Sequence, residues 1–322
     1  MKALIASITT CILILNPFNN LHGQIVDKGE KGPGLGKYSK PEEVAERNSP
    51  TPPPAEASSR ARKSRKAPRD RPDTQTVIES SIKTNTDHPV HLFILSGQSN
   101  MAGMNPETGF LPEAEKLFGE NKVGYIKVAK GGQPICRWLA EWENIAKEKG
   151  LDERHRQRIL KGEGVLFYQP ILDEYKAMLE KHPQPKSVTF CWMQGERDAN
   201  GGAQAAYKDA LKQLIANLRR DLERPDMNIV IGRIGDYAID NPQSGSLGVR
   251  KAQREIVDED PRGAWVDVDD LNDKLVDGVM KSVVHYNRPE GYIVLGQRFA
   301  RQGHALVTGE EPAADGRPKG VE

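Results

Sequence analysis

Short apolar runs recur along the chain from residue 88 onward, separated by longer segments of helical periodicity. Each run has little alternation between apolar and polar positions, which is typical of strands buried on both faces, as in a parallel sheet. The predicted strands are Val90–Leu95, Val123–Val128, Val188–Met193, Ile229–Ile234 and Ala264–Val268.

The segments between these runs have the spacing of amphipathic helices. In one of them Leu211, Leu214 and Leu218 follow each other at intervals of three and four residues and share one face. The predicted helices are Val165–Glu180, Ala203–Leu222, Leu247–Asp258 and Pro289–Ala305, with a charged insertion or surface helix within residues 141–163. Alternating strands and helices predict an α/β fold, a three-layer α/β/α sandwich with about five parallel strands.

The amino terminus has a different pattern. Met1 and Lys2 precede the apolar run Ala3–Leu15, and a small-residue site follows at Gly23 and Gln24. This order predicts a signal peptide over residues 1–23 and hence a secreted, periplasmic or cell-surface protein. The alternative is an uncleaved anchor helix, although the run is short of the ~20 residues that span a bilayer.

Residues 24–87 are polar and rich in proline, with 13 Lys and Arg, 10 Asp and Glu, eight Pro and one aromatic residue, Tyr38. Such a segment buries too little apolar surface to offset its ordering entropy, so we expect a disordered linker. Seven of the twelve residues Arg60–Arg71 are basic, which suits either a solvated linker or a contact with anionic glycans or the cell surface. The folded domain is then expected over residues 88–306, followed by a disordered tail over 307–322.

Composition argues against several classes of function for this chain. Lys and Arg number 46 against 45 Asp and Glu, so the net charge of +1 argues against a nucleic-acid-binding protein. No apolar run after the amino-terminal segment is long enough to span a membrane. Cys136 and Cys191 lack the CxxC spacing of zinc or redox sites, which leaves one disulfide or two buried thiols.

Ligands bind at the carboxyl ends of the strands in open α/β sheets, so these positions carry the candidate chemistry. The first strand is followed by Gly97, Gln98, Ser99 and Asn100. A serine in a glycine-flanked turn between a buried strand and a helix is displayed as a nucleophile, with backbone N–H groups directed at a developing oxyanion. The alternative for Ser99 is a helix N-cap.

Two further strand ends carry candidate residues. The second strand is followed by Gly131 and Gly132, which either let the backbone approach a ligand or simply form a tight turn. The third is followed by Gln194, whose side-chain amide could donate to an oxyanion, and by Glu196 and Arg197, for which a local ion pair is the alternative.

A serine nucleophile needs a base, normally a histidine within hydrogen-bonding reach. Of the seven histidines, His285 is the one that follows the last predicted strand and precedes a helix, in a loop that can reach the edge of the sheet where Ser99 is expected.

These four blocks, in this order, resemble the SGNH-hydrolase superfamily, in particular its sialate O-acetylesterase-like branch, which is also grouped as carbohydrate esterase family six. The resemblance covers roughly residues 88–305 and includes the strings Gly97–Met101, Gly131–Gly132, Trp192–Glu196 and His285–Tyr292. It implies a flavodoxin-like sandwich, no metal or other cofactor, and removal of O-acetyl groups from an acetylated polysaccharide or oligosaccharide.

One departure from the family pattern concerns the acid. Its members usually carry an Asp two or three residues before the histidine, where this chain has Val283 and Ser282. A carboxylate in that place orients the imidazole and stabilises its charged form. Asp277 is the candidate substitute, with Asp273 behind it, unless the site works as a Ser–His dyad.

The expected mechanism is attack by Ser99 with His285 as base, the oxyanion being held by the N–H groups of Ser99 and Gly132 and by the Gln194 amide. Gln98, Glu196 and Arg197 are further candidates for the pocket. Two alternatives remain: a catalytically impaired glycan-binding homologue, which the missing Asp favours, and a different SGNH serine hydrolase such as a lipase or thioesterase.

Overall fold

The computed structural model describes residues 76–82, 90–241 and 243–310. The predicted signal peptide, the linker apart from residues 76–82, and residues 311–322 of the predicted tail lie outside these ranges. Within the described ranges, no helix combines the length and the apolar composition that a membrane crossing requires.

The core of the domain is a six-stranded sheet with the order β1-β3-β2-β4-β5-β6. Strands β2 to β6 pair in parallel, and β1 pairs antiparallel with β3. Numbered among themselves, the parallel strands have the order 2-1-3-4-5 of flavodoxin-like sheets. The predicted α/β/α fold and its parallel strands are confirmed. The strands are β1 (Thr76–Ile82), β2 (His91–Gly97), β3 (Val123–Lys130), β4 (Ser187–Met193), β5 (Asn228–Gly232) and β6 (Gly263–Val266).

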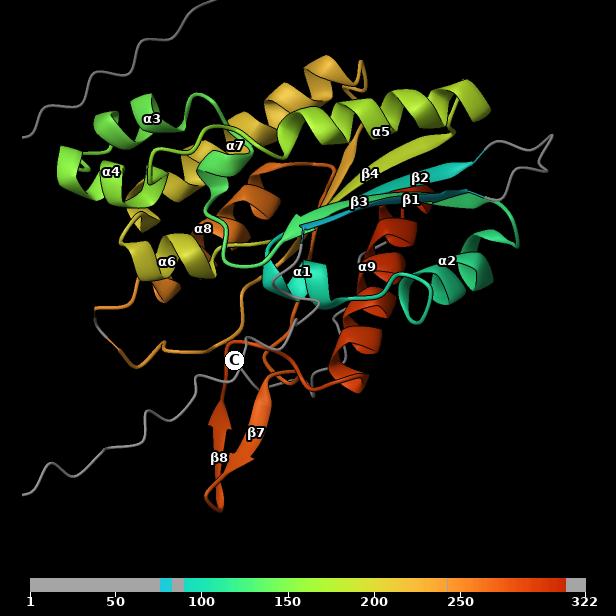
Figure 1. Cartoon of the computed structure of the whole chain (residues 1–322). Helices are drawn as coiled ribbons and strands as arrows, with labels where there is room; N and C mark the ends of the chain where they lie inside the picture. Colours follow the sequence, from blue (N-terminus) through green and yellow to red (C-terminus); the bar gives the residue numbers. More distant parts are fainter. Residues whose placement is uncertain (1–75, 83–89, 242, 311–322) are drawn as a thin grey trace, which may run out of the picture. The chain divides into compact units, whose positions relative to one another are not determined.

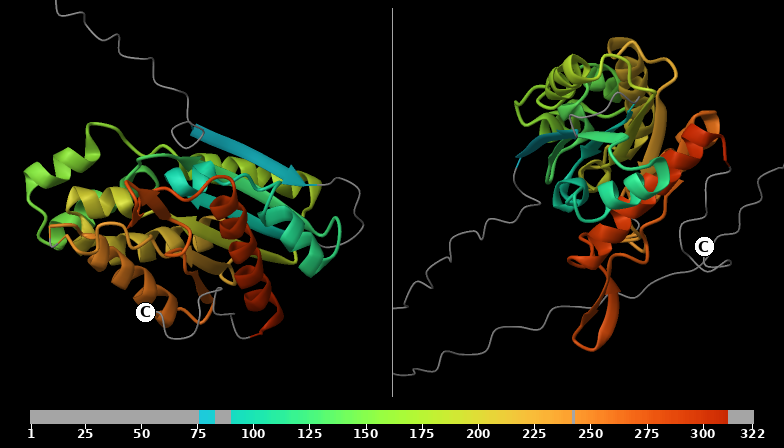
Figure 2. Two further views of the ribbon diagram at one scale, coloured as in Figure 1. Left: turned by 90° about the horizontal axis from the view of Figure 1, so that it is seen from below. Right: turned by 90° about the vertical axis from the view of Figure 1, so that its right-hand side faces the viewer.

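Helices cover both faces of this sheet (Figure 1). Helices α2 and α9 pack together on one face, while α7 packs with α8 and α5 lies against β3 on the other. Figure 2 shows the same layers from below and from the side. The helices are α1 (Ser99–Gly103), α2 (Phe110–Phe118), α3 (Trp142–Glu148), α4 (Glu153–Leu160), α5 (Tyr168–Lys181), α6 (Glu196–Gly201), α7 (Gln204–Asp221), α8 (Ser246–Glu259) and α9 (Glu290–Thr308).

The predicted long helices all form, and the charged segment 141–163 contains the surface helices α3 and α4. The apolar runs are buried because helices cover both faces of the strands; every residue of β2 and β4 is buried. Cys136 and Cys191 are buried free thiols, which settles the choice that the sequence left open.

The strand β1 corrects one prediction, since residues 76–82 were assigned to the disordered linker. An edge strand is stabilised mainly by backbone pairing, so it needs few apolar side chains, and β1 buries only part of its surface. Its Glu79 forms an ion pair with the buried Lys127 of β3 at 3.3 Å.

A second sheet, missed by the sequence analysis, is the hairpin of β7 (Asp273–Val276) and β8 (Val279–Ser282). Asp277 and Gly278 form its turn with φ angles of 51° and 77°, a pair that suits a two-residue hairpin loop. The hairpin projects from the rest of the domain (Figure 1), and Leu275, Val279 and Met280 are exposed.

The order of the strands determines where a site can form. From β2 the chain crosses first to β3 on one side and later to β4 on the other, so β2 is the switch point of the sheet. The carboxyl ends of β2, β3 and β4 therefore lie side by side at the place where open α/β sheets bind ligands.

Candidate active site

Ser99 begins α1 directly after β2 and is buried apart from a small exposed fraction. Gly97 precedes it with a φ of 147°, and a Cβ at this position would overlap the carbonyl oxygen of Met193 in β4. The next residue, Gln98, donates its backbone N–H to that same oxygen at 2.9 Å. The glycine thus lets the turn stay close to β4, which fixes the position of Ser99.

The loop after β3 brings Gly132 to the same place, with a φ of 71° that favours glycine. Two side chains from the segment after β4 hold this loop. Asp198 accepts the backbone N–H of Ile135 at 3.0 Å, and Gln194 donates its Nε2 to the carbonyl oxygen of Gln133 at 3.0 Å.

Gln194 and Asp198 are also joined to each other, because Gln194 Nε2 donates to Asp198 Oδ2 at 2.5 Å. Both side chains are fully buried, and Gln194 does not line the pocket that contains Ser99. The predicted role of Gln194 as an oxyanion donor is therefore not what its contacts indicate in this structure. Its amide braces the Gly132 loop instead.

Ser99, Gly132 and His285 line one cavity of about 370 Å³. The structure thus brings together residues from three separate parts of the chain, as the sequence analysis predicted for the edge of the sheet. The other residues that line this cavity are Gln98, Gly131, Glu196, Arg197, Asn200 and Val284.

Glu196 is the acidic residue among those that line this cavity. Its Oε1 accepts a hydrogen bond from Asn100 Nδ2 at 2.9 Å, while its Oε2 is buried and has no hydrogen-bond partner among the described residues. Burial raises the pKa of Glu196 to about 7, although its own backbone N–H and the Asn100 amide lower it in part. Burial likewise raises the pKa of Asp198 to about 6.

Arg197 lies at the start of α6, and Gln98 directly precedes α1. Gln98 Oε1 accepts the backbone N–H of Arg197 at 3.3 Å, which ties the serine turn to this helix. Arg197 is half-buried in the cavity wall. Among the described residues no ion pair joins it to Glu196, so the local ion pair considered for these two does not form.

His285 lies in the segment between β8 and α9, and this segment is fastened from two sides. Asn272 accepts the backbone N–H of Val283 through its own carbonyl oxygen at 3.0 Å, and its Nδ2 donates to the Val283 oxygen at 2.9 Å. From the other side, Asn100 Nδ2 donates to the carbonyl oxygen of Val284 at 3.0 Å.

Asp277, the candidate substitute for the acid that the family carries before its histidine, lies on the β7–β8 hairpin. Asp277 is exposed at the tip of the β7–β8 hairpin, and it does not line the cavity. Asp273 is exposed at the base of the hairpin, where it accepts a hydrogen bond from Ser282 Oγ at 3.4 Å. Because residues 273–282 pair as a hairpin, the chain leads Asp277 away before it returns to His285.

Three residues of this region were given no role in the sequence analysis: Asn100, Asn200 and Val284. Asn100 stands within the motif that identified Ser99, so its position was visible but its partners were not. Those partners, Glu196 and Val284, lie 96 and 184 residues further along the chain.

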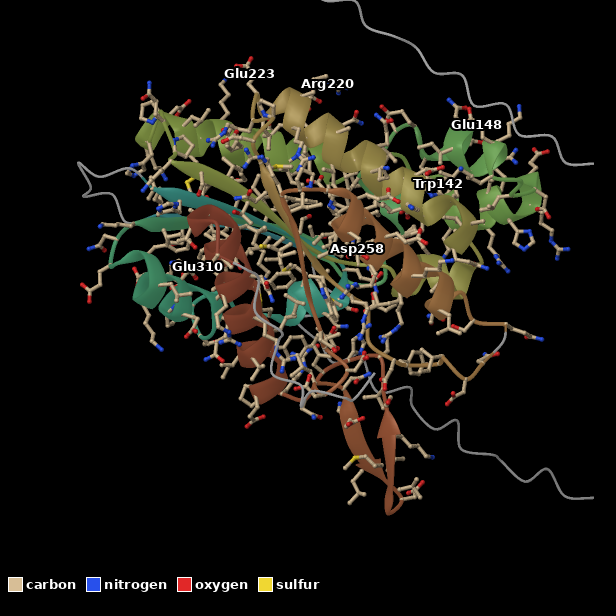
Figure 3. The ribbon with its side chains drawn as sticks, turned by 180° about the vertical axis from the view of Figure 1, so that it is seen from behind. Trp142, Glu148, Arg220, Glu223, Asp258 and Glu310 are labelled. Carbon is tan, nitrogen blue, oxygen red and sulfur yellow. The ribbon has the colours of Figure 1, made fainter. Side chains whose placement is uncertain are left out.

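A larger hollow of about 580 Å³ lies along α7 and α8, away from the predicted residues. Its floor includes Ile215 and Ile256, and its rim includes Arg220 and Glu223, which Figure 3 labels at the end of α7. It contains neither a nucleophile nor a base of the predicted set. Within the described part of the chain, no cluster of three or more His, Cys, Asp or Glu side chains could hold a metal ion.

Comparison with known sequences gives two matches. The family model described as "Carbohydrate esterase, sialic acid-specific acetylesterase" matches residues 103–304, a range that includes Gly132, Gln194 and His285. A "Probable 9-O-acetyl-N-acetylneuraminic acid deacetylase" of Escherichia coli (strain K12) is 30% identical over 94 residues. The matched stretch covers 28% of this chain. The chain thus spans 28% of the length of that curated relative.

Comparison with solved structures gives matches of low sequence identity. A protein from Arabidopsis thaliana is 19% identical, with a TM-score of 0.47 over 69% of this chain and 99% of that one. A carbohydrate acetylesterase from Xanthomonas citri is 16% identical, with a TM-score of 0.45 over 62% of this chain and 40% of that one.

Proposed function

The chain belongs to the carbohydrate esterase family of sialic acid-specific acetylesterases, and from this we propose that it is a secreted serine esterase that removes O-acetyl groups from a carbohydrate. Membership confirms the family resemblance of the sequence motifs and supports the class of carboxylic ester hydrolase. The observation that carries the proposed mechanism is the single cavity lined by Ser99, Gly132 and His285.

In the proposed reaction, Ser99 Oγ forms a bond to the acetyl carbonyl carbon while His285 takes the hydroxyl proton. The tetrahedral intermediate collapses when the bond from carbon to the sugar oxygen breaks, and His285 passes its proton to that oxygen. Water then attacks the acetyl-enzyme with His285 again as base. The bond to Ser99 Oγ breaks, its proton returns, and acetate leaves.

The negative charge that develops on the carbonyl oxygen needs hydrogen-bond donors that are already in place. The backbone N–H groups of Ser99 and Gly132 fit this role, because both residues line the cavity and both sit in turns held by buried contacts. Gln194 contributes by bracing the Gly132 loop.

The test of this mechanism is acetate release from a chromogenic acetyl ester such as p-nitrophenyl acetate. Ser99→Ala should lower kcat/KM by at least about 10⁴-fold, because the nucleophile is lost. Labelling of the wild type, but not of Ser99→Ala, by a fluorophosphonate probe is the accompanying result. Equal hydrolysis rates in the two proteins would disprove the assignment.

Secretion is supported by the amino-terminal pattern of Met1 to Gly23. The expected result is export of the full chain with a new amino terminus at Gln24, read by sequencing the exported protein. An unprocessed protein retained in the membrane would favour the anchor helix.

A further inference from the structure

Asn100 uses each side of its amide group to join a different part of the site. Its Nδ2 donates to Glu196 Oε1 at 2.9 Å and to the Val284 carbonyl oxygen at 3.0 Å. Its Oδ1 accepts the hydroxyl of Tyr292 in α9 at 3.2 Å. The side chain is fully buried, although Asn is a residue type that is mostly exposed in proteins.

The contact with Val284 matters because of the residue that follows it. A peptide unit is planar, so the direction of the Val284 carbonyl also sets the direction in which the backbone enters His285. At the other end, the Cα atoms of Ser99 and Asn100 are joined by one peptide unit and lie ~3.8 Å apart. One hydrogen bond therefore relates the backbone of the nucleophile to the backbone of the base.

The two other contacts keep the amide in one orientation. Glu196 accepts one of the two Nδ2 protons, and the Tyr292 hydroxyl marks Oδ1 as the acceptor side. Rotation of the amide by 180° would place its oxygen against the oxygens of Glu196 and Val284. Such a rotation would lose the hydrogen bonds to Glu196 and Val284, and buried polar groups without partners are unfavourable.

On the basis of the proposed esterase function, we propose that Asn100 is a positioning residue, which holds the His285 segment in register with Ser99 through the Val284 carbonyl. It touches neither the acetyl group nor the water in the proposed reaction. The segment that contains His285 is held from two sides. Asn272 holds it on the side of the hairpin, and Asn100 holds it on the side of α1, the helix that begins with Ser99.

The first experiment measures kcat and KM of Asn100→Ala and Asn100→Leu with p-nitrophenyl acetate. Leu has the same branched arrangement of side-chain heavy atoms as Asn but carries no donor or acceptor, so it separates loss of packing from loss of hydrogen bonds. We expect kcat to fall by about 10²-fold in both variants, the effect of a small misplacement of catalytic groups, with little change in KM. Unchanged kcat in both variants would overturn the proposal.

The second experiment asks whether Asn100 acts through His285. In the His285→Ala background, added imidazole supplies a base that is not attached to the chain. A residue that only positions His285 should then have no effect, so His285→Ala and His285→Ala/Asn100→Ala should have the same imidazole-dependent rate. A further fall in the double variant would show a general structural role and overturn the proposal.

Asn217→Ala is the matched control. Asn217 is a buried asparagine in α7 that donates to Glu141 at 3.1 Å and does not line the cavity. Its loss should leave kcat unchanged. If Ser99→Ala retained wild-type activity, the proposed function itself would fail; normal Asn100 variants beside an inactive Ser99→Ala would overturn this inference alone.

Discussion

Ser99 and His285 line the same cavity, but the parts of the molecule that carry them are built differently. Ser99 follows a strand that is buried along its whole length, and its turn is in contact with the backbone of the neighbouring strand. His285 follows a hairpin on which Leu275, Val279 and Met280 are exposed. The nucleophile side is thus fixed by the sheet, whereas hydrogen bonds that include those of Asn100 and Asn272 hold the segment of the base.

This difference predicts which substitutions should affect folding and which should be tolerated. Changes on the nucleophile side disturb close-packed backbone and should affect folding first. Changes on the exposed hairpin should be tolerated, whereas loss of the contact between Asn100 and Val284, which lies outside the hairpin, should not be.

The largest effect is expected for Gly97→Ala compared with Gly278→Ala. Both glycines have positive φ angles, but a Cβ at Gly97 overlaps the Met193 carbonyl, whereas a Cβ at Gly278 meets nothing within 4 Å. Gly97→Ala should lower the free energy of unfolding by at least about 4 kcal/mol. Gly278→Ala should lower it by about 1–2 kcal/mol through backbone strain alone. If urea unfolding showed the same loss of free energy of unfolding for both variants, the difference between the two regions would be contradicted.

The next effect concerns the pH dependence of stability. Burial raises the pKa of Glu196 to about 7, so its contribution to stability is present at low pH and is lost as pH rises toward 7 and above. Glu196→Gln should therefore gain stability relative to the wild type between pH 4 and 8, by up to about 3 kcal/mol. Urea unfolding of both proteins across this range measures the gain.

Glu255→Gln provides a control of opposite sign. The hydrogen bond from Lys208 lowers the pKa of Glu255, so this carboxylate contributes stability above its unfolded pKa, and the variant should lose stability as pH rises. A Glu196→Gln variant whose stability relative to wild type did not rise with pH would contradict the assignment of a buried, poorly solvated carboxylate to the cavity.

A smaller effect is expected at the brace of the Gly132 loop. Asp198→Ala and Gln194→Ala each remove one of its contacts, and each should lower kcat by about 10²-fold through misplacement of the loop. Because the two side chains act as one unit, the double variant should be no slower than either single one. Multiplied effects would instead indicate that Gln194 donates directly to the oxyanion.

The smallest effect is expected on the hairpin. Leu275→Ser together with Met280→Ser replaces two exposed side chains and should change the free energy of unfolding by about 0.5 kcal/mol or less. The contrast is Leu95→Ala in β2, a fully buried position where about 2–5 kcal/mol should be lost. A large loss from the hairpin pair would mean that this surface is packed against something in solution.

Much of the fold followed from local patterns. The five parallel strands were predicted because strands buried on both faces consist of consecutive apolar residues. The long helices were predicted because burial of one face spaces apolar residues three or four positions apart. Strand β1 and the β7–β8 hairpin were missed, since edge strands and exposed hairpins are stabilised by backbone pairing rather than by apolar side chains.

The sequence by itself determined the candidate nucleophile and base, because Ser99 and His285 stand in recognisable local surroundings. Tertiary structure alone decided that Gln194 braces a loop, that Asp277 sits at a hairpin tip and that Asn100 contacts Glu196 and Val284. The physical reason is that residue type limits what a side chain can donate or accept. Its partner is selected by segments that meet only when the sheet has formed.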